Sequence, residues 1–355
     1  MQNNLNPSNA NVIAVNRDNR GFTILEVIIA MTIFMMVTGA IWGVLRIALL
    51  SRTTVNQQVQ LAKNVRLALN VIGKDTYNAG FGYPVNSTVV LPDNRISAAI
   101  GIPNDYDTTR DTVPPIIAGN QINLDTYNTT ANTRTDQITL LFKDSSFNTA
   151  SGVSTPLNIF APTSGTGYSQ IVPVSGSNSV CNVNDLYLIT GTNGSRLGVA
   201  TSLVGANSIR FADGDVMGLN LAGSTDSILG ITGNAAIQRV KMLTYFVASD
   251  GTLTRREFVN VPPVSPAVAY VDEPLVYGVD DFQIQYIMDD GTITDNPSAG
   301  PDAVAGTADD IQSNLAAVRQ IRYTVSARST ELNSSGQPFR ETMTSTFSTR
   351  NLGYN

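Results

Sequence analysis

The sequence predicts an α+β protein in which one long amino-terminal helix precedes a large antiparallel β-rich domain. Three features of the 355-residue chain predict this fold. Residues 22–45 are apolar almost without interruption. A helical spacing of apolar residues then continues to about residue 79. From residue 80 onwards, short runs of β-branched and aromatic residues alternate with Gly, Asn, Asp and Pro, which is typical of strands and turns.

The composition excludes several classes of function. The chain has no histidine and one cysteine, so it has no histidine general base, no Ser-His-Asp triad and no intramolecular disulfide. Lys and Arg number 22 and Asp and Glu number 28, which gives a formal net charge of −6. An acidic chain with only 14% charged residues is a poor ligand for nucleic acid, so we predict no nucleic-acid partner.

Residues 1–21 and residues 22–45 are predicted to be a leader and a transmembrane helix. The leader is rich in Asn and ends in a basic stretch that includes Arg17 and Arg20. The 24 residues that follow contain one ionisable side chain, Glu26. As a helix they would extend about 36 Å, enough to cross a bilayer. Because arginines flank both ends of this span, the charge pattern alone leaves its direction open.

The junction between leader and span has the sequence Arg20-Gly-Phe-Thr-Ile-Leu-Glu26. It resembles the processing site of type IV prepilins and of type II secretion pseudopilins. This resemblance implies that a membrane peptidase cuts between Gly21 and Phe22 on the cytoplasmic side and methylates the new amino terminus. Glu26 then becomes the fifth mature residue, the position that carries a glutamate in that family. The resemblance also implies that the leader lies inside and the rest of the chain outside.

Glu26 needs a physical reason to stand within an apolar helix. A carboxylate at the centre of a membrane span costs about 2.5–3.5 kcal/mol, and less towards an end. The free amine of Phe22 would lie about one helical turn away, on the same chain or on a packed neighbour. In the family, this glutamate pairs with a neighbour's terminal amine during assembly. The alternative is a lone acid near the headgroups.

Residues 46–79 are predicted to continue the helix in amphipathic form. We expect the apolar stripe to lie against a sheet, because such a helix is not stable alone in water. We expect Gly73 to be the first residue that weakens the helix and the turn at 79–84 to terminate it. A bare stalk is the alternative. The stripe consists of Val55, Val59, Ala62, Val65, Leu69 and Ile72.

Residues 61–82 also resemble the end of the long helix in PilW-type minor pilins and in the J-type pseudopilin of type II secretion. The matching features are Arg66, the pair Lys74-Asp75 and the turn Ala79-Gly80-Phe81. A second resemblance to PilW-type proteins covers about residues 240–353, which end in Thr349-Arg-Asn-Leu-Gly353.

Residues 80–355 are predicted to form a β-rich pilin-like domain with a variable insertion at about 84–233. Asp250-Gly251 between two strand-like runs predicts a tight hairpin. The predicted strands cover residues 136–142, 185–190, 208–211, 240–247, 253–259, 282–287 and 318–327.

One acidic stretch raises the question of calcium. Calcium takes six to eight oxygen ligands from a loop that wraps around it, and the composition of this stretch suits that requirement. Its spacing does not match an EF-hand, so a solvated hairpin tip with Asx turns is the alternative. We predict no other cofactor. The acidic residues are Asp289, Asp290, Asp295, Asp302, Asp309 and Asp310.

These resemblances imply a non-enzymatic minor pilin that takes part in type IV pilus assembly. After cleavage and methylation at Phe22 it would join the pilus or its initiating tip complex. The implied partners are the prepilin peptidase, the major pilin, other minor pilins, the inner-membrane assembly platform and membrane lipid. The implied location is the inner membrane, with a single pass and the carboxy-terminal domain outside the cytoplasm, and later the pilus or cell surface.

Two alternatives remain open from the sequence. A J-type pseudopilin of type II secretion would carry the same amino-terminal signal. From other classes, a membrane-anchored adhesin or a carboxylate-dependent hydrolase would also fit an exported domain, since paired Asp and Glu chemistry needs no histidine.

Overall fold

The architecture was analysed in a computed structural model of the 355-residue chain. The chain forms two compact units, Met1–Asn56 and Gln57–Asn355, and helix α1 (Ile24–Asn78) runs through the boundary. The structure describes residues 21–84, 89–103, 109–124, 127, 134–145, 156–160, 168–173, 181–205, 208–231, 234–259, 269–297, 312–332 and 336–352.

Helix α1 has 55 residues and ends where the sequence predicts. Gly80, with φ +78°, follows its last turn in the left-handed conformation that favours glycine, and the Ala79 N–H still donates to the Asp75 carbonyl oxygen. The expectation that Gly73 is the first residue that weakens the helix is wrong, because α1 continues through it to Asn78. A Cβ at Gly73 would lie 2.2 Å from a ring carbon of Phe347, so this glycine lets the helix approach a strand closely.

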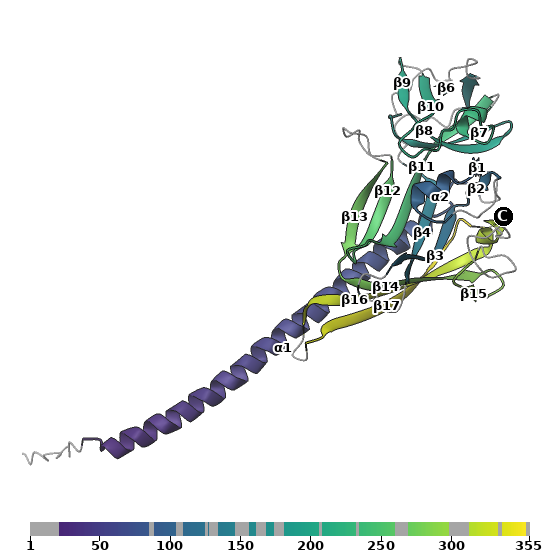
Figure 1. Ribbon diagram of the computed structural model, residues 1–355. Helices are drawn as coiled ribbons and strands as arrows, with labels where there is room; N and C mark the ends of the chain where they lie inside the picture. The colour runs from purple at the N-terminus through teal and green to yellow at the C-terminus, as the bar shows by residue number, and fades with distance from the viewer. Residues whose placement is uncertain are drawn as a thin grey trace, which may run out of the picture. The chain divides into compact units, whose positions relative to one another are not determined.

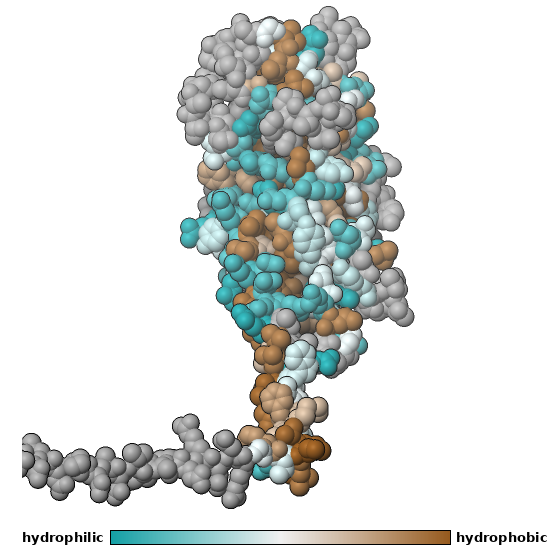
Figure 2. Space-filling view, turned by 90° about the vertical axis from the view of Figure 1, so that its left-hand side faces the viewer, coloured by the Kyte–Doolittle hydropathy of each residue, from teal (hydrophilic) through white to brown (hydrophobic). Residues whose placement is uncertain are grey.

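The first unit holds a helical segment suited to a membrane. Ile24–Leu49 is long and apolar enough to cross a bilayer by length and composition, with a mean hydropathy of 2.3, and none of it is buried. Most of its visible side chains are brown in Figure 2. Thr32 and Thr38 donate their hydroxyl protons to the carbonyl oxygens of Ile28 and Phe34, which satisfies these polar groups within the helix.

The second unit is built from strands. These strands form a 13-stranded sheet and a four-stranded sheet. Strands and short helices are β1 (Val89–Leu91), α2 (Arg95–Ile100), β2 (Asp111–Thr112), β3 (Ile116–Leu124), β4 (Arg134–Lys143), β5 (Pro156–Phe160), β6 (Tyr168–Pro173), β7 (Leu186–Gly191), β8 (Gly194–Val199), β9 (Ser202–Val204), β10 (Ser208–Ala212), η1 (Ile228–Gly230), β11 (Asn234–Val247), β12 (Leu253–Phe258), β13 (Tyr270–Val276), β14 (Val279–Met288), β15 (Ile293–Thr294), η2 (Gln312–Ala317), β16 (Val318–Leu332) and β17 (Pro338–Ser348).

Strand β11 organises the larger, 13-stranded sheet. Its first residues pair antiparallel with β5 and β7, and its last residues pair antiparallel with β4 and β12. The β11–β12 turn is the predicted tight hairpin, with Gly251 at φ +78°. The smaller sheet has the order β15-β14-β16-β17, and every pairing in it is antiparallel. All seven predicted strands are present, so the α+β class is confirmed.

Both sheets contribute to the core around the second half of α1, from Gln57 to Asn78 (Figure 1). The larger sheet supplies side chains such as Leu140 and Tyr245, and the smaller sheet supplies side chains such as Phe282 and Tyr323. The helical face that they bury consists of Leu61, Val65, Ala68, Leu69 and Ile72. A helix buried on one face in this way is stabilised by tertiary packing rather than by intrinsic propensity.

This buried face differs in part from the predicted stripe. Val65, Leu69 and Ile72 are buried as expected, but Val55 and Val59 are exposed and Ala62 is only partly covered. The reason is helical geometry. Leu61 lies eleven residues before Ile72, which is three turns, so Leu61 shares the face of Ile72 while Val59 does not.

Polar contacts attach α1 to both sheets. The Asp75 carboxylate accepts hydrogen bonds from the Tyr245 hydroxyl (2.5 Å) and from Arg255 Nε (3.0 Å) in the larger sheet. One residue later, the Thr76 hydroxyl lies 2.8 Å from the hydroxyl of Tyr323 in the smaller sheet. Burial raises the pKa of Tyr245, so its hydroxyl stays protonated and serves as a donor. These contacts set the rotation of the helix between the sheets.

The sheets are also joined directly at Asp136. This buried carboxylate on β4 accepts the N–H of Ile284 on β14 (2.7 Å) and the N–H of Gln121 on β3 (2.9 Å). Gln121 has φ +52° within a bulge of β3, which turns its N–H towards the carboxylate. Although β3 and β4 fall in the range expected to be a variable insertion, β4 pairs with β11 and β3 pairs with β4. Both strands contribute buried side chains, such as Ile116 and Leu140, to the core around the helix.

Candidate functional site

The amino end of the described chain is open to an approaching protein. Gly21, Phe22 and Thr23 precede the first residue of α1, and the Phe22 side chain is 87% exposed. A Cβ on Gly21 would meet no described atom within 4 Å. Among the described residues, no packing contact requires glycine at position 21.

Glu26 is held at the start of α1 by Thr23. Glu26 Oε2 accepts the backbone N–H of Thr23 (2.9 Å) and its hydroxyl proton (3.0 Å), and the N–H of Glu26 lies 3.3 Å from the Thr23 hydroxyl oxygen. This reciprocal arrangement is a capping box, in which a threonine before the helix and a glutamate three residues later satisfy each other's backbone donors. A carboxylate in the first turn is also favoured by the helix dipole.

The capping box gives Glu26 a second role that the sequence analysis missed. The pattern Thr-x-x-Glu before an apolar run is visible in the sequence, and it is a recognised signature of a helix start. Both bonds from Thr23 go to Oε2, so they leave the Oε1 atom of this exposed side chain able to accept a bond from a cation. The geometry thus allows Glu26 to cap its own helix while it binds an amine.

Comparison with known families identifies this segment. The family model described as the prokaryotic N-terminal methylation motif matches residues 16–42. The chain has a prepilin-type amino terminus. The match supports a type IV pilin-like protein that is anchored in a membrane, is processed by a prepilin peptidase and associates with pilin assembly machinery. No curated protein matches the chain.

The residues that resemble PilW-type proteins take distinct positions in the second unit. Arg66 and Lys74 are exposed on α1, whereas Asp75 is buried against Arg255. The two segments of the resemblance meet at the end of the helix. Leu352 packs over Gly80, where a Cβ would lie 2.8 Å from Leu352 Cδ2.

The candidate calcium residues do not gather in the described part of the chain. Asp289 lies 3.4 Å from Arg319 in an ion pair, and Asp290 accepts the N–H of Thr292 in an Asx turn at the β14–β15 hairpin. Within the described ranges, no three Asp, Glu, Cys or His side chains are placed to hold a metal ion. Asp295 is described, and the candidates outside the described residues are Asp302, Asp309 and Asp310.

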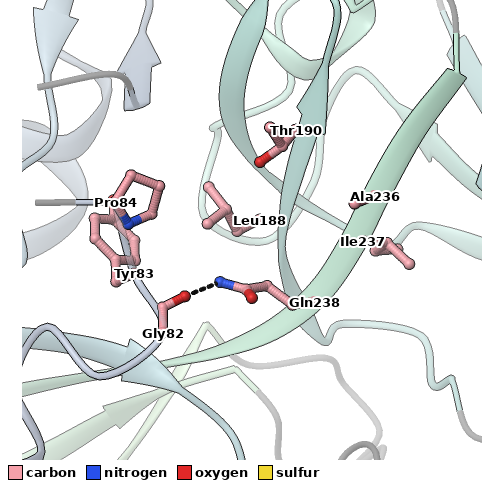
Figure 3. Close-up of a pocket in the computed structure, with 8 residues that line it drawn as sticks. All are labelled: Gly82, Tyr83, Pro84, Leu188, Thr190, Ala236, Ile237 and Gln238. Atoms are coloured by element: carbon pink, nitrogen blue, oxygen red, sulfur yellow. Dashed lines mark hydrogen bonds between the residues drawn. The ribbon is translucent and has the colours of Figure 1, made fainter. Parts of the chain in front are cut away.

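A pocket of about 320 Å³ opens between β7, β11 and the segment after α1 (Figure 3). Gln238 donates its side-chain N–H to the carbonyl oxygen of Gly82 across this pocket. Tyr83 is buried and donates its hydroxyl proton to the Val113 carbonyl oxygen. The lining supplies no carboxylate or thiol, so it offers no acid–base pair for hydrolysis. It consists of Gly82, Tyr83, Pro84, Leu188, Thr190, Ala236, Ile237 and Gln238.

Proposed function

We propose that this protein is a PilW-like minor pilin of a type IV pilus. It acts by assembly and not by catalysis: after cleavage and N-methylation at Phe22, it joins the pilus or its initiating tip complex. Its partners are the major pilin, other minor pilins and the inner-membrane assembly platform. The β-rich domain lies outside the cytoplasm.

The observation that carries this proposal is the methylation motif at residues 16–42, placed at the capped start of a membrane-suited helix. The long helix packed on an antiparallel sheet adds to it, because this is the fold that the resemblance implies. The PilW-like assignment itself rests on Arg66, Lys74-Asp75, the turn Ala79-Gly80-Phe81 and the segment 240–353 that closes with Thr349-Arg-Asn-Leu-Gly353.

Glu26 is the assembly group in this proposal. In the unassembled chain its Oε2 caps the helix through Thr23. In the filament, the methylated amine of a neighbouring pilin binds the free side of the carboxylate. A charge-assisted bond in a low-dielectric environment is strong, and an unpaired carboxylate there is costly. Subunits whose amine and carboxylate are out of register are therefore rejected.

Mass spectrometry of the mature amino terminus tests the processing step. The expected product begins with N-methylated Phe22. An intact Met1 in cells that contain an active prepilin peptidase would overturn the proposal. Glu26→Gln should be processed like the native chain but should be depleted from sheared filaments, because the neutral amide cannot pair with an ammonium.

The J-type pseudopilin of type II secretion is the second candidate, because the same motif precedes it. Deletion of the gene separates the two. Loss of surface pili with normal secretion supports the minor pilin, and the reverse result supports the pseudopilin. The pocket in Figure 3 gives no support to a hydrolase, since its lining has no carboxylate.

A further inference from the structure

The face of α1 that points away from the sheets has an unusual composition. Along residues 57–78 the buried face is centred on Val65 and Ile72, and the opposite face is exposed. This exposed face combines cations with apolar side chains that are a third to a half exposed. We call it the cationic face. It consists of Lys63, Arg66, Leu67, Val71, Lys74 and Tyr77.

The charge on this face is of one sign. Within the described chain, Lys63, Arg66 and Lys74 make no ion pair, and all are exposed. The one acid between residues 57 and 78 is Asp75, which is buried and bound to Arg255. The guanidinium of Arg350 adds a further cation 4.8 Å from the Tyr77 ring centroid. A positive face on a protein of net charge −6 predicts an acidic partner.

The apolar side chains of the cationic face indicate that the partner contributes apolar contacts as well as negative charge. Leu67 is 53% exposed, and it stands between Lys63 and Val71 at spacings of four residues. Side chains at such spacings line one side of a helix, and a helix that presents apolar anchors flanked by charge typically receives a second helix. This face belongs to the same helix that begins with the prepilin motif.

We propose that the cationic face docks an acidic amphipathic helix of a second pilin-like subunit. Apolar side chains of that helix cover Leu67 and Val71, and its carboxylates pair with Lys63, Arg66 and Lys74. This inference rests on the proposed function, and it names the chemistry of the partner. Exposed charges that surround an apolar contact, such as these three cations, determine which partner binds and in which register more than they increase the affinity.

An anionic membrane surface would also attract cations, and the acids of the neighbouring sheet are engaged elsewhere. Arg255, which holds Asp75, is also bound to Glu257 (3.4 Å) and Glu273 (3.3 Å), and the Glu273 side chain is 61% exposed. Asp272 stands next to Glu273 on the same strand. These carboxylates pair with Arg255 and Arg256 on the sheet, so they do not neutralise the cationic face. The crosslink described below distinguishes a protein helix from a membrane as its partner.

Two variants with equal net charge test the inference in the full chain. In the first, Lys63→Gln, Arg66→Gln and Lys74→Gln remove three positive charges from the cationic face. In the control, Gln320→Glu, Thr330→Glu and Thr346→Glu add three negative charges at exposed positions on β16 and β17. Both variants should be cleaved at Gly21 and should unfold like the native chain, since every substituted side chain is exposed.

Incorporation into sheared filaments is the first readout. We expect the triple Gln variant to be depleted about tenfold relative to the control, which corresponds to about 1.4 kcal/mol. A photocrosslinker at Leu67 in the native chain should form an adduct with a carboxylate-rich helix of another processed pilin-like protein. Substituting the carboxylates of that helix by Lys should restore incorporation of a Lys63→Glu, Arg66→Glu, Lys74→Glu variant.

Each contrary outcome has its own meaning. Equal incorporation of the two variants, or a crosslink to phospholipid instead of protein, would overturn the inference. The Glu26→Gln variant separates this failure from failure of the proposed function. If Glu26→Gln is depleted while the triple Gln variant is not, the minor pilin proposal stands and the docking face is wrong. If Glu26→Gln is incorporated normally, the assembly proposal itself fails.

Discussion

The two halves of α1 are helical for different reasons. Residues 24–49 are apolar on every side, and none of that segment is buried in the protein, so its helix is suited to lipid as a solvent. Residues 57–78 bury one face against two sheets and expose a cationic face on the other side. One continuous helix therefore combines a lipid-facing segment with a segment that depends on tertiary packing. The same substitution should therefore destabilise the folded domain in the second half of α1 and leave it unchanged in the first half.

The largest expected difference is between two leucines of the second half. Leu69 is 2% exposed in the core, so Leu69→Ala should lower the free energy of unfolding of the Gln57–Asn355 unit by about 3 kcal/mol. Leu67→Ala, two residues earlier on the cationic face, should change it by less than about 0.5 kcal/mol. Urea unfolding of the full chain in detergent measures both. Similar losses for the two variants would contradict the assignment of the buried face.

Through Asp136, which joins the two sheets around the second half of α1, the free energy of unfolding should depend on pH. Burial raises the pKa of Asp136 from 3.8 to about 6, so the folded state binds this proton more tightly than the unfolded state. The protonated Asp136 carboxyl group therefore contributes to the stability of the folded state. This contribution is fully present below about pH 4 and is lost as the pH rises through 6. We expect the Asp136 contribution to change by on the order of 2–3 kcal/mol across this window.

The Asp136→Asn variant isolates this contribution. The free energy of unfolding of this variant should lack the pH-dependent contribution of Asp136. From pH 7 to pH 4, the native chain should therefore gain stability relative to the variant. The carboxyl carbon of Asp136, followed by NMR, should titrate near pH 6. A midpoint near 4 would show that burial does not control this group.

Two glycines sharpen the comparison between the halves. Gly73→Ala would place a methyl group within 2.2 Å of the Phe347 ring, so it should destabilise the second unit by about 2 kcal/mol. Gly43→Ala meets no described atom within 4 Å and should leave that unfolding transition unchanged. Thermal unfolding monitored by near-ultraviolet circular dichroism distinguishes them. If Phe347 rotates away without loss, the two variants will behave alike.

The smallest expected effect is at the first turn of α1. Thr23→Ala removes the cap and should lower the local stability of the helix start by about 1 kcal/mol. Amide hydrogen exchange of residues 25–27 in micelles should become about fivefold faster. Thr38→Ala is the matched control, because its hydroxyl bonds the Phe34 carbonyl oxygen inside the helix. Unchanged exchange in Thr23→Ala would argue against the capping box.

Much of the candidate site could be read from residue order because its signals are local. Gly21, Phe22 and Glu26 lie within six residues, and the span that follows is defined by composition. The pattern that predicts the Thr23 cap is equally local, but from the sequence we predicted only an amine partner for Glu26. The helix end at Ala79-Gly80 followed from the left-handed preference of glycine, and strands such as β4 and β11 from their branched and aromatic residues.

Other features depended on which segments meet. Gly73 resembled a helix breaker and is a contact with Phe347, which lies 274 residues later in the chain. β17 exposes threonines on one side and packs Met343 and Phe347 on the other, so its mixed composition gave a weak strand signal. Asp136 resembled an ordinary strand residue until the bulge in β3 and the start of β14 brought two N–H groups to it.

Residue order alone thus specified the amino-terminal motif, the membrane-suited span, the length of α1 and the α+β class, because each depends on chemistry within a few neighbouring residues. The tertiary structure decided which helical face is covered, why Gly73 is small, how Asp75 and Asp136 are partnered and where unpaired cations remain exposed. Those properties arise from contacts between residues distant in the chain, whose free energy depends on burial and close packing and has no local signature.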